Sequence, residues 1–199
     1  MPIFRVQGNP TNPNVPTVGF ADNFNRSDGP LGFTPVGLKP YIQLDAVPTS
    51  PGVVRVVSNR AQATSVGGFV YQVLECYESN GTLTATAAVV GNRQGGLAVR
   101  AKDANNLIRL ALRLSAAGPT YTLQLVSTTV AQANLATSSV TSNNGDTIAI
   151  VMDGPSIKVI VNGTEIMSAS TPHFVNETKH GMSFAQTDVA IDNLAFAAA

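Results

Sequence analysis

The chain has 199 residues, and its 12 basic and 12 acidic side chains cancel to a net charge of zero. Charged residues make up only 12% of the chain, about half of the roughly 25% that is usual in soluble proteins. The sequence therefore offers no basic surface for a nucleic acid and no polybasic run for a membrane surface. A hydrophobic share of 44% is enough for a packed core, and the length fits one β domain or a small domain with an arm.

Residues 1–19 predict an extended arm, because prolines interleaved with asparagines allow neither a helix nor a central strand. The apolar residues Ile3, Phe4 and Val6 stand ahead of most of these prolines. A loose terminus seldom begins with such a cluster, so we expect these three side chains to dock on a partner. The sequence shows no secretory leader pattern, and no apolar run approaches the roughly 18 residues of a membrane span.

The next stretch, residues 20–32, predicts a turn held by charged side chains. Arg26 lies between Asp22 and Asp28 and can pair with either carboxylate. The triplet that starts at Asp28 and continues through Gly29 to a proline is a turn signal. These residues therefore indicate a tied loop at the start of the folded domain.

Alternating and apolar runs predict short strands in the following part of the chain. Residues 41–44 suit an edge strand, and residues 53–57 suit the next one. Residues 69–77 are nearly apolar on both faces, which indicates a strand covered on both sides. Cys76, the single cysteine, excludes an internal disulfide, and we expect it to be a small buried residue in that strand.

Residues 97–114 fit two structures. Leucines with a spacing of three and four residues are compatible with a helix that Asp103 would cap. The same leucines alternate with Arg109 and Arg113, which favours a strand. We predict two strands, because residues 97–100 alternate as well and residues 104–106 suit a hairpin turn.

Residues 146–163 carry the clearest hairpin signal in the chain. Two runs of β-branched residues flank the turn Asp153-Gly154-Pro155, and Gly154 supplies the positive φ that such turns need. A two-stranded ribbon cannot bury so much aliphatic surface alone, so an opposing sheet is expected.

Three segments together resemble a concanavalin A-like (laminin G-like) jelly-roll domain of the kind found in tailed-phage virion proteins. The opening pattern D-x-F-x-R-x-D-G-x-L-G is matched at Asp22, Phe24, Arg26, Asp28, Gly29, Leu31 and Gly32. The hairpin around residues 96–106 and the final strand around Asp192 are similar to the middle and closing strands of this family. The resemblance implies an all-β, antiparallel two-sheet jelly-roll sandwich over residues 20–199, behind the extended N-terminal arm of residues 1–19.

The sequence does not indicate catalysis. Glycan cleavage needs two carboxylates about 5–10 Å apart across a sugar. Glu75 and Glu78 are three residues apart and would point to opposite faces of a strand. The chain has no Trp to serve as a sugar platform. We therefore expect no enzyme and no catalytic residue.

A metal site is not favoured either. His173 and His180 lie in one Pro-containing loop without a third ligand, and we expect ordinary exposed histidines. Calcium needs only oxygen ligands. The resemblance implies that the first and last strands pair, which would bring four such residues together: Asp22, Asp28, Asp192 and Asn193. Pairing of these carboxylates with Arg26 is the favoured alternative, so no cofactor is predicted.

Binding or structural roles remain. A weakly charged sheet face with exposed polar and aromatic side chains is one candidate surface, and an ordinary solvated face is the simpler alternative; the candidate residues are Tyr71, Arg100, Arg109, Arg113 and Tyr121. We predict a non-enzymatic phage virion protein, a minor tail component or capsid decoration that docks by its arm on other virion subunits, self-associates and contacts host-surface polysaccharide. The alternative is a carbohydrate-binding adhesin module, and a glycan-cleaving enzyme is the least favoured reading.

Overall fold

The computed structural model describes residues 18–90, 95–112 and 121–199, and every regular element in these ranges is a β-strand. None of the described residues forms a helix that is long and apolar enough to cross a bilayer. The strands are β1 (Phe20–Asp22), β2 (Gly29–Pro30), β3 (Ile42–Asp45), β4 (Val53–Val57), β5 (Arg60–Ser65), β6 (Val70–Glu75), β7 (Gly81–Val89), β8 (Gly95–Asp103), β9 (Asn106–Leu112), β10 (Tyr121–Val126), β11 (Ala133–Ser138), β12 (Asp146–Asp153), β13 (Ser156–Val161), β14 (Thr164–Ser170), β15 (Lys179–Phe184) and β16 (Ala190–Ala198).

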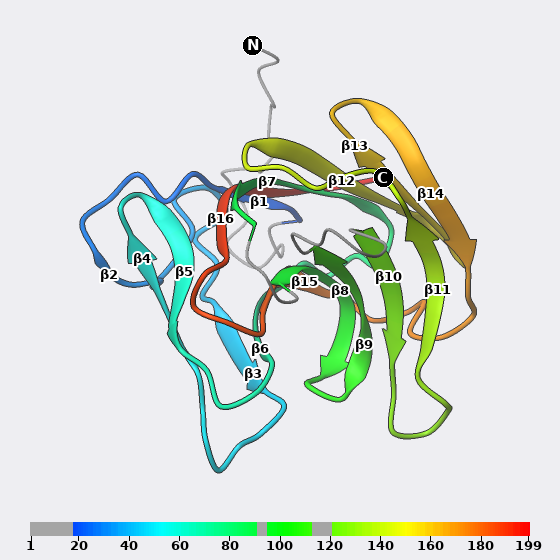
Figure 1. The fold of residues 1–199 in the computed structure, drawn as a ribbon, viewed down its shortest axis with the longest axis horizontal. Coiled ribbons are helices and arrows are strands. Elements are labelled where there is room, and N and C mark those ends of the chain that lie inside the picture. The colour runs from blue at the N-terminus through cyan, green and yellow to red at the C-terminus, as the bar shows by residue number, and fades with distance from the viewer. Residues whose placement is uncertain (1–17, 91–94, 113–120) are drawn as a thin grey trace, which may run out of the picture.

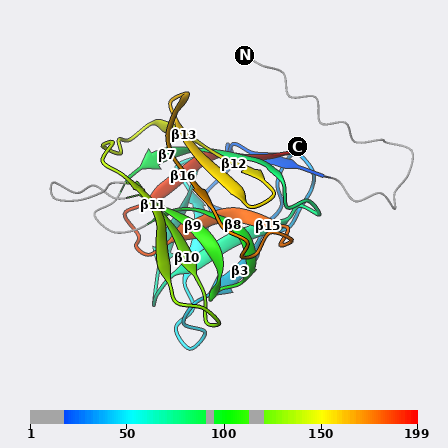
Figure 2. The same ribbon diagram turned by 90° about the vertical axis from the view of Figure 1, so that its right-hand side faces the viewer.

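The strands form two antiparallel sheets that pack face to face (Figures 1 and 2). A nine-stranded sheet has the order β14-β13-β12-β7-β16-β5-β4-β2, with β1 also paired to β16. A seven-stranded sheet has the order β11-β10-β9-β8-β15-β6-β3. The predicted fold class, an all-β antiparallel two-sheet sandwich of the jelly-roll type, is confirmed.

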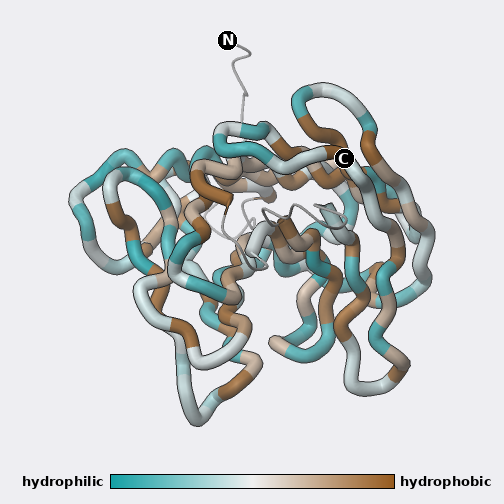
Figure 3. The backbone as a smooth tube through the Cα atoms, in the orientation of Figure 1, coloured by the Kyte–Doolittle hydropathy of each residue, from teal (hydrophilic) through white to brown (hydrophobic). Residues whose placement is uncertain are grey.

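Strict alternation explains why these segments are strands with one buried face. In β7, Leu83, Ala85 and Ala87 are buried, while the threonines between them remain partly exposed. Hydrophobic and hydrophilic residues alternate in this way along many strands of both layers (Figure 3). The buried set of each sheet meets that of the other, and this contact forms the main core.

The predicted hairpin in residues 146–163 is confirmed as β12 and β13. Ile150 pairs with Val159, and the register continues to Asp153 opposite Ser156. Gly154 has a φ of 49° in the connecting turn, a conformation that costs a side chain roughly 1–2 kcal/mol. The position of this glycine therefore sets the length of the hairpin.

Residues 97–112 are strands, so the helical alternative is excluded for that part of the predicted segment. β8 and β9 pair with each other, and Asn106 Nδ2 donates to both carboxylate oxygens of Asp103 at 3.0 Å across their turn. Cross-strand neighbours on both sides stabilise these strands more than the local helical spacing of the leucines could.

The opening motif ties the loop that follows β1, as predicted. Arg26 donates to Asp22 through Nη1 at 2.7 Å and Nη2 at 3.0 Å, and Nη2 also reaches the Leu31 carbonyl oxygen at 2.6 Å. The Tyr41 hydroxyl donates to Asp22 at 3.0 Å. Asp28 does not join this network, because its carboxylate accepts from the Ser58 backbone N–H at 2.8 Å. Arg26 thus pairs with the first of its two candidate carboxylates.

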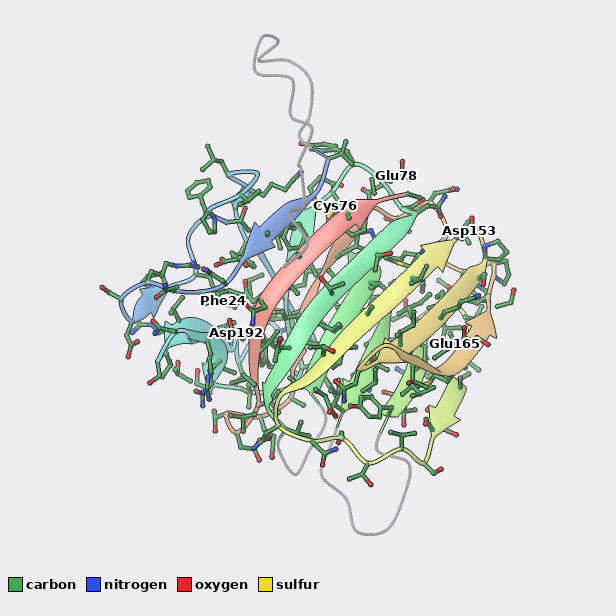
Figure 4. The ribbon with its side chains drawn as sticks, turned by 90° about the horizontal axis from the view of Figure 1, so that it is seen from above. Phe24, Cys76, Glu78, Asp153, Glu165 and Asp192 are labelled. Carbon is green, nitrogen blue, oxygen red and sulfur yellow. The ribbon has the colours of Figure 1, made fainter. Side chains whose placement is uncertain are left out.

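Pairing of the first and last strands is also observed, with Phe20 opposite Phe196 and Asp22 opposite Leu194. The two phenylalanine rings stack with centroids 6.4 Å apart. This pairing adds β1 to the nine-stranded sheet beside β16. It also places Asp192 close to the tied loop, where Figure 4 shows it near Phe24.

Strand β6 is covered on both faces, as predicted. Val70 and Leu74 face the main core, whereas Tyr71 and Val73 belong to a second buried cluster on the outer face of the seven-stranded sheet. Cys76, directly after β6, is also buried, and burial raises the pKa of its thiol to about 12. The outer face of this sheet is therefore a packed layer in its own right.

Candidate functional site

The outer face of the seven-stranded sheet carries a row of side chains that are cross-strand neighbours. From β6 to β11 the row reads Val73, Gly181, Ala98, Arg109, Gln124 and Asn134. In β8, β9 and β10 the residues on either side of the row belong to the main core, so this row points away from it. The strands that carry it lie side by side in Figure 1.

The middle of this row is made of small residues, which leaves space for a long side chain to lie over the sheet. Gly181 and Ala98 occupy the two positions between Val73 and Arg109. In the adjacent row, Ser183 is opposite Tyr71, and its buried hydroxyl has no hydrogen-bond partner.

The Arg109 side chain lies over these small residues, and several contacts hold it in place. Its guanidinium carbon lies 3.7 Å from the centroid of the Phe69 ring. Nη1 donates to the Tyr71 hydroxyl at 3.3 Å, and Nε donates to Gln124 Oε1 at 2.7 Å. Only 9% of Arg109 is exposed, so ring contact and hydrogen bonds fix this cation in one position.

The aromatic side of the cluster is also ordered. The rings of Phe69 and Tyr71 are stacked with centroids 6.0 Å apart. Burial raises the pKa of Tyr71, although the positive charge of Arg109 and its hydrogen bond oppose the shift. The hydroxyl therefore keeps its proton at neutral pH while it accepts from Arg109.

Gln124 extends the network to the edge of the sheet. Its Nε2 donates to Asn134 Oδ1 at 3.0 Å, and Asn134 is exposed on β11. A pocket of about 210 Å³ opens at this end. Its lining combines one guanidinium and three amides with a few apolar side chains: Arg109, Gln124, Gln132, Asn134, Leu125, Val126 and Ala133.

The five residues predicted to line one sheet face do not all lie together. Tyr71 and Arg109 are in direct contact on the outer face, and Arg113 lies outside the described residues. Tyr121 is wrong as a surface residue, because it points into the main core and donates from its hydroxyl to Asp146 at 2.6 Å. It lies on the same face of β10 as the inward residues Leu123 and Leu125, a pattern that assigns it to the core.

Arg100 is also buried, with no exposed surface, so its assignment to an exposed face is wrong. Its φ of 51° lies at an irregularity in the pairing of β8 with β9, which breaks the simple alternation. Its guanidinium donates to the Ser79 carbonyl oxygen at 3.3 Å and to Asn80 Oδ1 at 3.2 Å, while Nη1 is buried without a partner. Arg100 therefore joins β8 to the loop before β7.

His180 is fully buried, which corrects the expectation of an exposed histidine. Its Nδ1 accepts from the Arg100 backbone N–H at 3.2 Å, so Nε2 carries the proton and donates to the Glu78 carbonyl oxygen at 3.0 Å. The ring stacks on Phe196 with centroids 4.7 Å apart. Burial lowers the pKa of His180 to about 4, and the positive charge of Arg100 acts in the same direction.

Acidic side chains do not gather at the pocket. Figure 4 shows Glu165 at the right, on the edge strand β14, and Asp192 at the left, on β16, with Glu78 and Asp153 toward the top. Burial raises the pKa of Asp146, but hydrogen bonds from Tyr121, the Asn143 backbone and Asn162 outweigh this and leave the pKa below its usual value. In the described ranges, no group of three or more His, Cys, Asp or Glu side chains is arranged to hold a metal ion.

The residues proposed for calcium are placed in different contacts. Asp22 is bound by Arg26, Asp28 accepts from the Ser58 backbone, and Asp192 accepts from the backbone N–H of Asn193 at 2.7 Å. Asn193 donates to the Thr86 hydroxyl at 3.3 Å. These oxygens thus satisfy local backbone and side-chain donors.

The outer face of the nine-stranded sheet has a different character. Two shallow pockets of about 350 and 430 Å³ share Thr84 and Asn193. Their lining is mainly threonine, alanine and short aliphatic residues, and the single carboxylate in it, Asp22, is already paired. This surface offers fewer fixed polar groups than the outer face of the other sheet.

Sequence reasoning missed Phe69, Gln124 and Asn134. A signal for Gln124 was present, because Thr122 and Gln124 form the polar side of an alternating strand. The partners of these residues depend on strand register across β6, β9, β10 and β11, which one sequence does not supply.

No protein-family model matches the chain, and no curated protein matches it by sequence. Solved structures do match. The carbohydrate-binding module CBM66 from Bacillus subtilis has a TM-score of 0.59 and 15% identity over 73% of this chain and 92% of that one. A protein provisionally assigned as a glycosyl hydrolase from Parabacteroides distasonis has a TM-score of 0.50 and 14% identity over 87% of this chain and 100% of that one. At these identities the likeness shows the shared β-sandwich fold.

Proposed function

We propose that the protein is a non-catalytic carbohydrate-binding module that uses the outer face of its seven-stranded sheet. The observation that carries this proposal is the hydrogen-bonded chain from Tyr71 through Arg109 and Gln124 to Asn134, which ends in an open pocket. The fold likeness to a carbohydrate-binding module supports the same function. This was the alternative interpretation of the sequence.

The chemistry of the pocket suits a sugar. Amide side chains both donate and accept hydrogen bonds, as sugar hydroxyls do, and the guanidinium adds fixed donors. Because Arg109 and Gln124 are already held by neighbours, a ligand would order few side chains on binding. The volume of about 210 Å³ lies below the roughly 300–1,000 Å³ of drug-sized sites, so the pocket would hold one sugar unit while the rest of the glycan lies over the sheet.

The absence of an acid pair at this site supports a binding role over hydrolysis. Glycosidases place two carboxylates roughly 5–10 Å apart on either side of the scissile bond. Among the described residues, those that line the pocket include no carboxylate. We therefore expect a bound glycan to be recovered intact.

The experiment is a titration of the protein with a panel of neutral and acidic polysaccharides, by affinity gel electrophoresis and calorimetry. Gln132→Ala and Asn134→Ala remove exposed amides at the pocket and should weaken binding at least tenfold. Thr147→Ala, on the other sheet, is the matched control and should bind like the unmodified protein. Equal affinity of all variants would contradict the proposed site, and no binding to any glycan would contradict the function.

A role in a phage virion, with location in the virion and other virion proteins as partners, stays a prediction from the sequence. One observation favours a docking role of some kind: exposed apolar side chains surround the point where residue 18 emerges. Removal of the arm, residues 1–19, should then abolish incorporation into the particle. Normal incorporation of the truncated chain would contradict it.

A further inference from the structure

Exposed apolar side chains are unevenly distributed over the molecule. Of the nine large hydrophobic residues that are exposed in the described ranges, five lie in or next to one hairpin, residues 32–41. They are Val18, Phe33, Val36, Leu38 and Tyr77, with exposed fractions of 45, 63, 38, 74 and 58%. We call these five residues the hairpin patch.

Backbone and ring contacts hold the patch together. Phe33 pairs with Pro40, and Val36 pairs with Ala21 on β1. A Cβ at Gly37 would lie 2.9 Å from the carbonyl oxygen of Gly19, so the hairpin lies directly against the segment that begins at Val18. On the other side, Lys39 Nζ lies 4.8 Å from the centroid of the Tyr77 ring.

Hydrogen bonds within this hairpin hold its apolar tip in a conformation that is exposed to solvent. The Thr34 backbone N–H donates to the Lys39 carbonyl oxygen at 3.0 Å, and the Thr34 hydroxyl donates to the Val36 carbonyl oxygen at 2.8 Å. Leu38 has a φ of 49°, which costs a non-glycine residue roughly 1–2 kcal/mol. A strained, 74% exposed leucine on an ordered hairpin is typical of a surface that another apolar group covers.

The chain itself contains a matching group. Ile3, Phe4 and Val6 form the apolar cluster of the N-terminal segment, which joins the described residues at the edge of the hairpin patch. Residues 7–17 between the cluster and the patch include three prolines. If extended, these 11 residues span about 34 Å, at roughly 3.1 Å per residue.

The three prolines disfavour a sharp turn in this spacer, so an extended spacer of that length would disfavour return of the cluster to the patch of its own chain. It instead favours delivery of the cluster to a neighbouring molecule. We propose that the hairpin patch of one copy binds Ile3, Phe4 and Val6 of a second copy, so that the chain self-associates by exchange of its N-terminal segments. This proposal does not depend on the carbohydrate site.

Charge is consistent with apolar contact between two copies. Within the described part of the chain, the cation of the hairpin is Lys39, which is largely buried and donates to the Glu75 carbonyl oxygen at 2.7 Å. The patch therefore presents no strong field, and the association should change little between low and high salt. Salt dependence would be expected for a charged partner.

The first test measures self-association of the full chain by analytical ultracentrifugation over a concentration series. Phe33→Ser with Leu38→Ser should weaken association at least tenfold, and deletion of residues 1–17 should weaken it to the same extent. Val130→Ser with Val140→Ser changes exposed apolar residues away from the patch and is the matched control. A full chain that stays monomeric, or a patch variant that associates normally, would overturn the proposal.

A second measurement distinguishes exchange from other arrangements. A labelled synthetic peptide of residues 1–17 is titrated into the chain that lacks these residues, and we expect saturable binding that the Phe33→Ser, Leu38→Ser variant loses. The full chain could be monomeric while the deletion variant still binds the peptide. This result would show that the segment covers the patch of its own chain, and it would contradict exchange between two copies. No peptide binding at any concentration would also overturn the proposal.

Discussion

The outer faces of the two sheets are built from similar alternating strands but differ in what they bury. On the nine-stranded sheet, Thr84 is partly exposed and Thr147 is exposed, and the pocket that they line also includes small residues such as Ala149 and Gly163. On the seven-stranded sheet, Tyr71 and Arg109 are 1% and 9% exposed, respectively, because small residues between them leave room for the arginine to lie flat. The first face is a solvated surface, and the second is a packed layer with a polar rim.

This difference explains why the candidate site lies on the seven-stranded sheet. Positions fixed by packing and hydrogen bonds can orient a ligand without further ordering. The threonine hydroxyls of the other sheet each make one hydrogen bond at 3.2–3.4 Å, as Thr84 does to the Ala195 carbonyl oxygen and Thr147 to Asn162 Oδ1. Arg109, in contrast, is held by a ring contact and two side-chain hydrogen bonds. Binding of a ligand would therefore cost less side-chain entropy on the face that carries Arg109.

The largest expected effect compares one substitution on each face. Tyr71→Ala should lower the free energy of unfolding by about 3–5 kcal/mol, because it removes a buried ring from the outer layer and one partner of Arg109. Thr84→Ala, on the other sheet, removes a weak hydrogen bond to the Ala195 carbonyl oxygen and a β-branched residue, and should change it by no more than about 1 kcal/mol. Urea unfolding followed by fluorescence or circular dichroism measures both, and similar values for the two would contradict the distinction between the faces.

Acid should act on the seven-stranded sheet through His180, which lies on β15. The pKa of His180 is about 4 in the fold, below the ordinary value of 6.5. The stability that this neutral histidine supports is therefore complete above about pH 6.5 and is lost as the pH falls toward 4, by about 3 kcal/mol in total. Unfolding midpoints at pH 7, 5.5 and 4.5 measure the loss.

The matched variant for this test is His180→Asn, which cannot gain a proton. It is less stable at pH 7, but its stability should fall less steeply between pH 6.5 and 4 than that of the unmodified chain. Since carboxylates titrate in both proteins, the difference between the two slopes reports His180. Parallel slopes would show that His180 does not carry the pH dependence.

A smaller effect tests the link between the packed layer and the pocket. Tyr71→Phe keeps the ring but removes the hydroxyl that accepts from Arg109, at a cost of about 1–2 kcal/mol. Because Arg109 also binds Gln124, we expect weaker glycan binding although residue 71 does not line the pocket. Unchanged affinity in calorimetry would mean that the pocket works without support from the aromatic side.

The smallest effect lies in a turn of the nine-stranded sheet. Gly154→Ala meets no atom within 4 Å, so only its φ of 49° opposes the new side chain. We expect a loss of about 1 kcal/mol and normal glycan binding. A loss of binding would indicate that the β12–β13 turn supports the ligand site.

The sequence predicted strands and core positions well where alternation was regular. β12 and β13 were recognisable from β-branched residues around a glycine turn, and Asp22 with Arg26 from their spacing. The failures have local causes. Arg100 lies at an irregularity in strand pairing, which changes the face of the sheet to which its side chain projects. His180 is buried against the ring of Phe196, which belongs to a different strand.

The candidate site was only half predictable. Tyr71 and Arg109 were recognisable as polar or aromatic residues on alternating strands, but their contact crosses two strands, over Gly181 and Ala98. Small residues at the centre of a sheet give no sequence signal of the space they leave. The position of the pocket follows from the register of β10 and β11, which the sequence alone leaves open.

The most direct measurement of the central claim is a two-dimensional NMR titration of the ¹⁵N-labelled protein with the glycan that binds best. We expect the side-chain amide signals of Gln124, Gln132 and Asn134 and the Arg109 Nε–H signal to shift together and saturate, while the signals of Thr84 and Asn193 stay in place. Shifts confined to the outer face of the nine-stranded sheet, with none at the four pocket residues, would contradict the account.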